Sequence, residues 1–214
     1  MHVFYLHGFA SSAQSKKAAY FADRLRPFGI ALRCPDFNEP DFATLTLTRM
    51  LAQVEDDIGT LDSNPVALIG SSLGAAVAIH TAVRLGSRID RLVLLAPALM
   101  FPKDAPHVVG ADRFDSWRRT RTLEVFHYAA GATRPLDYGF YEDGLQYDAF
   151  GADIRQPVQI VQGLRDEAVD HRVVERFAAA RPNVQLALLD DDHQLMNSLP
   201  AIWKDMAAFL GLPA

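Results

Sequence analysis

Short apolar runs alternate with amphipathic stretches along the chain of 214 residues. Six of these runs predict buried strands, over residues 3–6, 30–34, 66–69, 92–95, 158–161 and 184–189. The stretches after most of them carry apolar residues at helical spacing and predict helices over about residues 15–26, 41–61, 73–85, 171–180 and 201–210. Strands that alternate with helices imply one parallel sheet covered by helices on both faces, with the spatial strand order 2-1-3-4-5-6.

One segment interrupts this alternation. About 60 residues, 97–156, separate the fourth and fifth predicted strands, which is more than a crossover helix needs. Ten of the 21 aromatic residues lie there, so we interpret the segment as a cap-like insertion within a single domain over residues 1–214. We expect Trp117, Phe126, Tyr138 and Tyr141 to line an apolar substrate pocket. The alternative is that these aromatic side chains only pack the insertion onto the domain.

The third predicted strand leads directly into Gly70-Ser71-Ser72-Leu73-Gly74 and then into an alanine-rich helix. A Gly-x-Ser-x-Gly sequence between a buried strand and a helix is typical of the nucleophile turn of α/β-hydrolases, where the glycines allow a turn too tight for side chains. Ser72 lies midway between the glycines and is the candidate nucleophile. The alternative is a turn whose glycines serve only helix packing.

A serine nucleophile needs a base and an orienting acid, which in this fold follow it along the chain, the acid first. His193 follows the sixth predicted strand and is the candidate base. His171, which we expect to begin a helix, is the weaker alternative. Asp166 follows the fifth strand and is the candidate acid, with Glu167 and Asp170 as competitors in the same loop.

The oxyanion that forms during acyl transfer needs backbone N–H donors, and we expect these from Leu73 and from Phe9 in the loop after the first strand. Gly8 would permit an unusual backbone turn in that loop. His7, beside it, is expected to stabilise the loop rather than to act as base. Three acidic residues precede the candidate base; they would favour an imidazolium, or form only a charged turn.

Composition narrows the function classes further. The net charge of −5 gives no support to nucleic-acid binding. The sequence lacks a zinc motif, a cysteine pair and a phosphate loop, so we expect no metal and no other cofactor. Its single cysteine, Cys34, cannot form an internal disulfide, which favours a reducing compartment. Met1-His2 leads into an apolar run without a basic region, and no run is long enough to span a membrane, so we expect a cytoplasmic protein that does not contact membranes.

The chain resembles the small bacterial esterases of the YqiA/YcfP type, within the α/β-hydrolase superfamily. The matching stretches are Tyr5-Leu6-His7-Gly8-Phe9-Ala10-Ser11-Ser12 with Ser15-Lys16-Lys17-Ala18, Ile69-Gly70-Ser71-Ser72-Leu73-Gly74, Asp166-Glu167-Ala168-Val169-Asp170 and Asp192-His193. The resemblance implies a triad of Ser72, His193 and Asp166 and the hydrolysis of a carboxylic ester or thioester. The family often has a second glycine where this chain has Ala75, and segment 97–156 lies outside the resemblance, so the substrate preference stays open.

We therefore expect a serine hydrolase that transfers the acyl group of a small-molecule ester or thioester to water through Ser72. Three alternatives remain at this point: a peptidase that uses the same three residues, a non-catalytic binding protein with the hydrolase fold, and a nucleotide-binding doubly wound protein. Gly70-x-x-x-Gly74 is too short a glycine pattern for the last of these.

Overall fold

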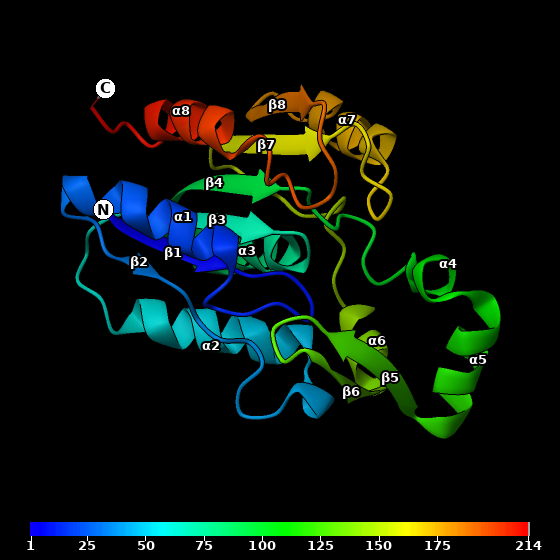
Figure 1. The fold of residues 1–214 in the computed structure, drawn as a ribbon. Helices are drawn as coiled ribbons and strands as arrows, with labels where there is room; N and C mark the ends of the chain where they lie inside the picture. Colours follow the sequence, from blue (N-terminus) through cyan, green and yellow to red (C-terminus); the bar gives the residue numbers. More distant parts are fainter. Residues whose placement is uncertain (214) are drawn as a thin grey trace.

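The structure is a computed structural model that describes residues 1–213, and it contains the six predicted strands in one parallel sheet (Figure 1). The order across this sheet is β2-β1-β3-β4-β7-β8, which confirms the predicted order. Its strands are β1 (His2–Leu6), β2 (Leu32–Arg33), β3 (Val66–Ser71), β4 (Ile89–Leu95), β7 (Val158–Gly163) and β8 (Val184–Leu189).

Helices cover both faces of the sheet because successive side chains of a strand point to opposite faces and both faces are apolar. On one face Leu68 and Leu94 belong to the core formed with α2, α3 and α7. On the other face Ile69 and Leu95 belong to the core formed with α1 and α8. These helices are α1 (Lys16–Leu25), α2 (Leu47–Gly59), α3 (Leu73–Leu85), α7 (His171–Ala179) and α8 (Leu199–Phe209). In the described part of the chain, no helix is both long enough and apolar enough to cross a membrane.

The start of α2 differs from the sequence prediction, which placed it near Asp41 or Thr44. Asp41 instead caps a separate 3₁₀ turn, η2 (Phe42–Thr44), by accepting a hydrogen bond from the Ala43 N–H. The next residue, Leu45, is extended, and α2 begins after Thr46, whose hydroxyl accepts from the Arg49 N–H. Two cap sequences lie close together here, and each begins its own helical element. The other 3₁₀ turns are η1 (Arg26–Phe28) and η3 (Gly86–Arg88).

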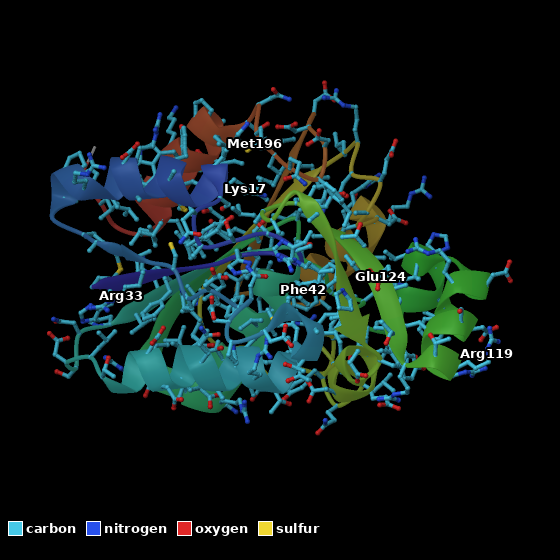
Figure 2. All side chains as sticks on the ribbon, turned by 60° about the horizontal axis from the view of Figure 1, so that its bottom comes forward. Lys17, Arg33, Phe42, Arg119, Glu124 and Met196 are labelled. Carbon is cyan, nitrogen blue, oxygen red and sulfur yellow. The ribbon has the colours of Figure 1, made fainter. Side chains whose placement is uncertain are left out.

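The segment between β4 and β7 lies beyond the carboxyl ends of the strands (Figure 1). It contains α4 (Ala105–Val109), α5 (Ala111–Thr120), β5 (Thr122–His127), β6 (Ala132–Asp137) and α6 (Gly139–Gly144). Strands β5 and β6 form an antiparallel hairpin that is separate from the main sheet. The hairpin packs on η2, where the rings of His127 and Phe42 meet edge to face at 4.7 Å (Figure 2).

Candidate active site

Ser72 lies at the junction of β3 and α3, in a turn whose geometry depends on two glycines. Its φ of +53° is unfavourable for a residue with a side chain, and such strain persists only where the surrounding structure imposes it. A Cβ at Gly74 would lie 2.0 Å from the Leu6 carbonyl oxygen, and a Cβ at Gly70 would lie 2.5 Å from the Gly74 carbonyl oxygen. Glycine at both positions therefore lets α3 pack directly against β1 and β3.

The structure brings Ser72, His193 and Asp166 into one hydrogen-bonded chain. The Ser72 Oγ lies 3.1 Å from the His193 Nε2. The His193 Nδ1 lies 2.8 Å from the Asp166 Oδ2. An ionised carboxylate can only accept, so Nδ1 carries the proton that it donates to Asp166, and Nε2 is left as acceptor for the serine hydroxyl. This is the tautomer that a general base needs.

Asp166 is held at the end of β7 by several donors. Its Oδ1 accepts hydrogen bonds from the N–H groups of Ala168 and Val169, each at 2.8 Å. Its Oδ2 accepts from the Gln162 Nε2 at 2.9 Å. Burial alone would raise the pKa of Asp166, but the hydrogen bond and charge of His193 and the donors Val169 and Gln162 lower the pKa overall. Asp166 thus stays ionised while its side chain is fully buried.

The competing residues have other partners. Asp170 accepts a hydrogen bond from the Arg172 N–H and caps α7. His171 lies on α7 and pairs with Glu175 at 2.7 Å. Glu167 is exposed to solvent. The geometry therefore distinguishes Asp166 and His193 from their neighbours, which the sequence had left as alternatives.

The turn before His193 is held by Asp191. Its carboxylate is fully buried and accepts hydrogen bonds from the N–H groups of Asp192 and Ser198 and from the Asn197 side chain. Asp190, by contrast, pairs with Arg165 on the surface. Sequence reasoning treated these acids as one charged group, whereas the structure gives Asp191 the separate task of shaping the loop that carries the histidine.

The loop after β1 lies directly against the turn that carries Ser72. A Cβ added at Gly8 would lie 3.2 Å from the Ser71 carbonyl oxygen and 3.3 Å from the Ser72 Cβ. Phe9 follows Gly8, and Leu73 is the first residue of α3, whose backbone N–H has no partner within the helix. Both expected oxyanion donors are thus on segments that border Ser72.

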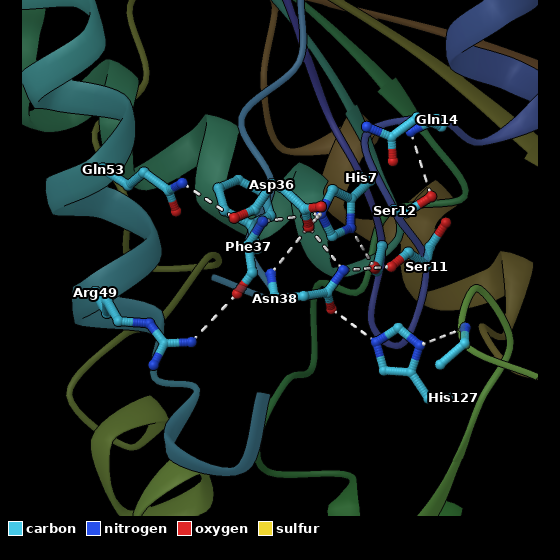
Figure 3. A network of polar contacts seen from close by, with 12 residues as sticks. His7, Ser11, Ser12, Gln14, Asp36, Phe37, Asn38, Arg49, Gln53 and His127 are labelled. Carbon is cyan, nitrogen blue, oxygen red and sulfur yellow. Dashed lines mark hydrogen bonds and ion pairs between the residues drawn. The ribbon is translucent and has the colours of Figure 1, made fainter. Parts of the chain in front are cut away.

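A polar network ties this loop to the β5–β6 hairpin (Figure 3). The ring of His7 is buried; its Nε2 accepts from the Phe37 N–H at 3.0 Å and its Nδ1 lies 2.9 Å from the Gly8 carbonyl oxygen. Asn38 donates to the Ser11 carbonyl oxygen, and its Oδ1 lies 2.8 Å from the His127 Nε2. His7 therefore acts within the loop structure, as expected, and the hairpin is anchored beside it.

Three of the four aromatic residues expected in a pocket pack on one another instead. Trp117 donates its indole N–H to the Leu136 carbonyl oxygen, and its ring meets Tyr138 edge to face at 5.3 Å. Tyr141 packs on Tyr138 at the same centroid distance, 5.3 Å. Phe126, on the hairpin, is 52% exposed. Mutual packing of these rings joins α5, the hairpin and α6, which is the alternative that the sequence had left open.

A different set of residues surrounds the space next to Asp166. A cavity of about 680 Å³ opens beside Asp166. It is lined by Ala98, Leu99, Met100, Asp104, His107, Val108, Asp166, Glu167, Ala168, Val169, Asp170 and Val173. Outside this lining, Phe140 of the insertion stacks its ring on Phe9 at 5.4 Å. Aromatic content marked the insertion in the sequence, but it did not indicate which ring reaches the loop after β1.

Solved structures share this fold. α/β hydrolase domain-containing protein 10 from mouse superposes with a TM-score of 0.83 over 98% of this chain and 89% of its own, at 17% sequence identity. Est1E from Butyrivibrio proteoclasticus, solved with bound ferulic acid, gives a TM-score of 0.82 over 97% of this chain and 87% of its own, at 21% identity. These similarities show that the protein has the α/β-hydrolase fold.

Sequence comparison gives the family. The chain is 28% identical over 163 residues to monoacylglycerol lipase abhd6-B from Xenopus laevis; the match covers 72% of this chain and 42% of that lipase. The chain thus spans less than half the length of this relative. The model of the "Uncharacterised protein family (UPF0227)" matches residues 2–211, nearly the whole chain. The protein therefore belongs to UPF0227, the YqiA/YcfP family that the sequence motifs indicated.

Proposed function

We propose that the protein hydrolyses carboxylic esters through an acyl-enzyme on Ser72. The observation that carries this proposal is the hydrogen-bonded chain from the Ser72 Oγ through His193 to the ionised Asp166. Serine is a poor nucleophile at neutral pH unless a neighbouring base accepts its proton. A neutral imidazole at 3.1 Å, oriented by a buried carboxylate, is such a base.

The reaction takes place in two halves. The Ser72 Oγ attacks the ester carbonyl carbon while the His193 Nε2 takes the hydroxyl proton, and the N–H groups of Phe9 and Leu73 stabilise the oxyanion. The C–O bond to the alcohol then breaks, and the imidazolium gives its proton to the leaving oxygen. Water, deprotonated by the same histidine, then attacks the acyl carbon. The bond from that carbon to the Ser72 Oγ breaks, the imidazolium returns its proton to the Oγ, and the carboxylic acid leaves. Asp166 stabilises the imidazolium in both halves without taking up the proton.

Relatives with ester chemistry support an ester as the substrate. The curated relative is a monoacylglycerol lipase, and Est1E was solved with ferulic acid, a carboxylic acid. Thioesters and amides present the same carbonyl to the nucleophile, so a panel of acyl-matched esters, thioesters and amides separates the esterase from a thioesterase or a peptidase. We expect the ester to give the highest kcat/KM of the three.

The central test uses matched variants of the three residues. Ser72→Ala should lower the kcat/KM for short p-nitrophenyl esters by about 10⁴-fold or more. His193→Ala and Asp166→Asn should also lower it strongly, whereas His171→Ala and Glu167→Gln, which alter neighbouring side chains of the same types, should leave it within about twofold. A fluorophosphonate should phosphonylate Ser72 with loss of fluoride. Turnover by Ser72→Ala at the wild-type rate would refute the proposal, and a wild-type protein without labelling or turnover would indicate a binding protein.

A further inference from the structure

Lys17 is a buried cation beneath the proposed nucleophile. It is the second residue of α1 (Figure 2). The residue is only 8% exposed, and its Nζ donates to the Ser71 Oγ at 2.9 Å. Lysine is rarely buried, because removing an ammonium from water costs several kcal/mol. A methionine would fill much the same space without this penalty. Packing alone therefore does not explain why a lysine occupies position 17.

The surroundings of the Lys17 ammonium link it to the active site. Ser71 is the last residue of β3 and directly precedes the strained Ser72. Tyr5 from β1 is buried, and its burial, opposed by the hydroxyls of Ser15 and Ser71, raises its pKa to about 12, so the phenol stays neutral. The hydrogen-bond partner of the ammonium is thus a neutral hydroxyl, and its charge is balanced from farther away.

The compensating negative charge comes from the two loops that carry Asp166 and His193. Burial lowers the pKa of Lys17 to about 8, while the negative charges of Asp166, Asp192 and Asp191 oppose this shift. Asp166 is the proposed orienting acid, and Asp191 shapes the turn before His193. The single positive charge thus faces the negative charges of both loops at once.

We propose that Lys17 is a positioning residue of the hydrolytic site: its ammonium fixes Ser71 beside the nucleophile and attracts the loops that bear Asp166 and His193. This inference rests on the proposed function. A hydrogen bond to Ser71 restrains the backbone that holds Ser72 at its positive φ, and such strained residues depend on their neighbours. The positive charge also favours the ionised form of Asp166, which the reaction requires.

The proposal predicts an alkaline decline in turnover. Near pH 8 the Lys17 ammonium loses its proton, and the attraction to the two loops is lost with it. The titratable and polar groups that face it are Tyr5, Ser71, Asp166, Asp191 and Asp192. The lowered pKa values of Asp166 and Asp191 keep both carboxylates ionised at pH 8, and the raised pKa of Tyr5 keeps its phenol neutral. Among these groups, the change of charge near pH 8 belongs to Lys17.

The test compares Lys17→Met with Lys16→Met, which removes the adjacent exposed charge, and with Lys17→Arg, which keeps the buried charge. For a p-nitrophenyl ester at pH 7, we expect Lys17→Met to lower kcat about tenfold or more with KM within about twofold, and Lys16→Met to match the wild type. The melting temperature of Lys17→Met should equal or exceed that of the wild type, because the buried charge is gone. A residue with a merely structural role would lower both stability and turnover.

The pH profile from 6 to 9.5 provides the second measurement. The alkaline decline near pH 8 should be absent from Lys17→Met and should move to higher pH in Lys17→Arg. Wild-type kcat in Lys17→Met, or an unchanged decline in either variant, would overturn the proposal; if Lys17→Met does not fold, the Lys17→Arg profile still decides. Ser72→Ala is assayed in parallel: its activity reports on the proposed function, independently of Lys17.

Discussion

At the scale of single residues, the orientation of Asp166 depends on a buried side chain beyond His193 and Ser72. Gln162 lies near the end of β7, is fully buried, and donates its Nε2 to the Asp166 Oδ2 at 2.9 Å. The same nitrogen also lies 3.1 Å from the Gly163 carbonyl oxygen and 3.3 Å from that of Val169. Gln162 thus joins the strand end to the loop and holds the oxygen that accepts the hydrogen bond from the His193 Nδ1.

We predict that Gln162→Leu lowers kcat/KM for an ester about tenfold. Leucine keeps most of the volume but removes a hydrogen bond to a charged group, which contributes about 1.5–3 kcal/mol, while Asp166 keeps its backbone donors. Steady-state kinetics at pH 7 measures the effect. Gln159→Leu, three residues earlier on the same strand, is the matched control and should keep wild-type kinetics. Equal activity of the two variants would show that Gln162 does not orient the acid.

The contrast between Ser72 and Gln162 shows what a sequence can indicate at this scale. Ser72, Asp166 and His193 each follow an apolar run, so the parallel sheet places them at one edge, and their order along the chain is informative. Lys17 acts on Ser71, a residue distant in sequence, and no local pattern specifies that contact. Gln162 contacts Asp166, four residues later, but only the folded loop turns that carboxylate back toward the strand end. A polar residue inside the apolar run of β7 was the one available signal for Gln162.

At the scale of elements, the contact between α3 and β1 positions the nucleophile, and Gly74 permits it. We predict that Gly74→Ala destabilises the protein by about 2–4 kcal/mol, because its Cβ would lie 2.0 Å from the Leu6 carbonyl oxygen and backbone would have to move. Urea unfolding measures the change. Gly59→Ala on α2 is the control: a Cβ there meets no atom within 4 Å, so we expect a gain of about 0.5–1 kcal/mol. If both variants unfold like the wild type, the close approach does not constrain the helix.

The sequence pattern did not reveal the elements of segment 97–156, and the β5–β6 hairpin shows why. Its strands are mostly exposed, and Pro135 lies within β6, so neither an apolar run nor a clean alternation marks them. Gly131, at a φ of +60°, lies just before β6 at the turn that joins the two strands. The buried strands of the main sheet, by contrast, were all recognised, because burial on both faces requires continuous apolar runs.

At the scale of the whole molecule, the segment between β4 and β7 folds back onto α3. His80 on α3 packs its ring against Tyr147 at 5.1 Å, where this segment returns to the sheet. Burial lowers the pKa of His80 to about 4; Arg84 acts in the same direction, and Asp148 opposes it. The contact between the segment and the helix is therefore made by an imidazole that stays neutral well below its usual pKa.

This contact makes stability depend on pH in a defined direction. Because the folded pKa of His80 is about 4 and the unfolded value is about 6.5, the unfolded chain takes up the proton first as the pH falls. The contribution of neutral His80 to the free energy of unfolding is intact above about pH 6.5 and is lost progressively toward pH 4. Its size is on the order of 1–3 kcal/mol after allowance for partial exposure.

We predict that His80→Phe loses less unfolding free energy than the wild type between pH 7 and pH 4. Urea unfolding at pH 7, 5.5 and 4 measures the slope, and His107→Gln, at an exposed histidine, should keep the wild-type slope. Parallel slopes for His80→Phe and the wild type would show that protonation of His80 does not oppose the docking of this segment.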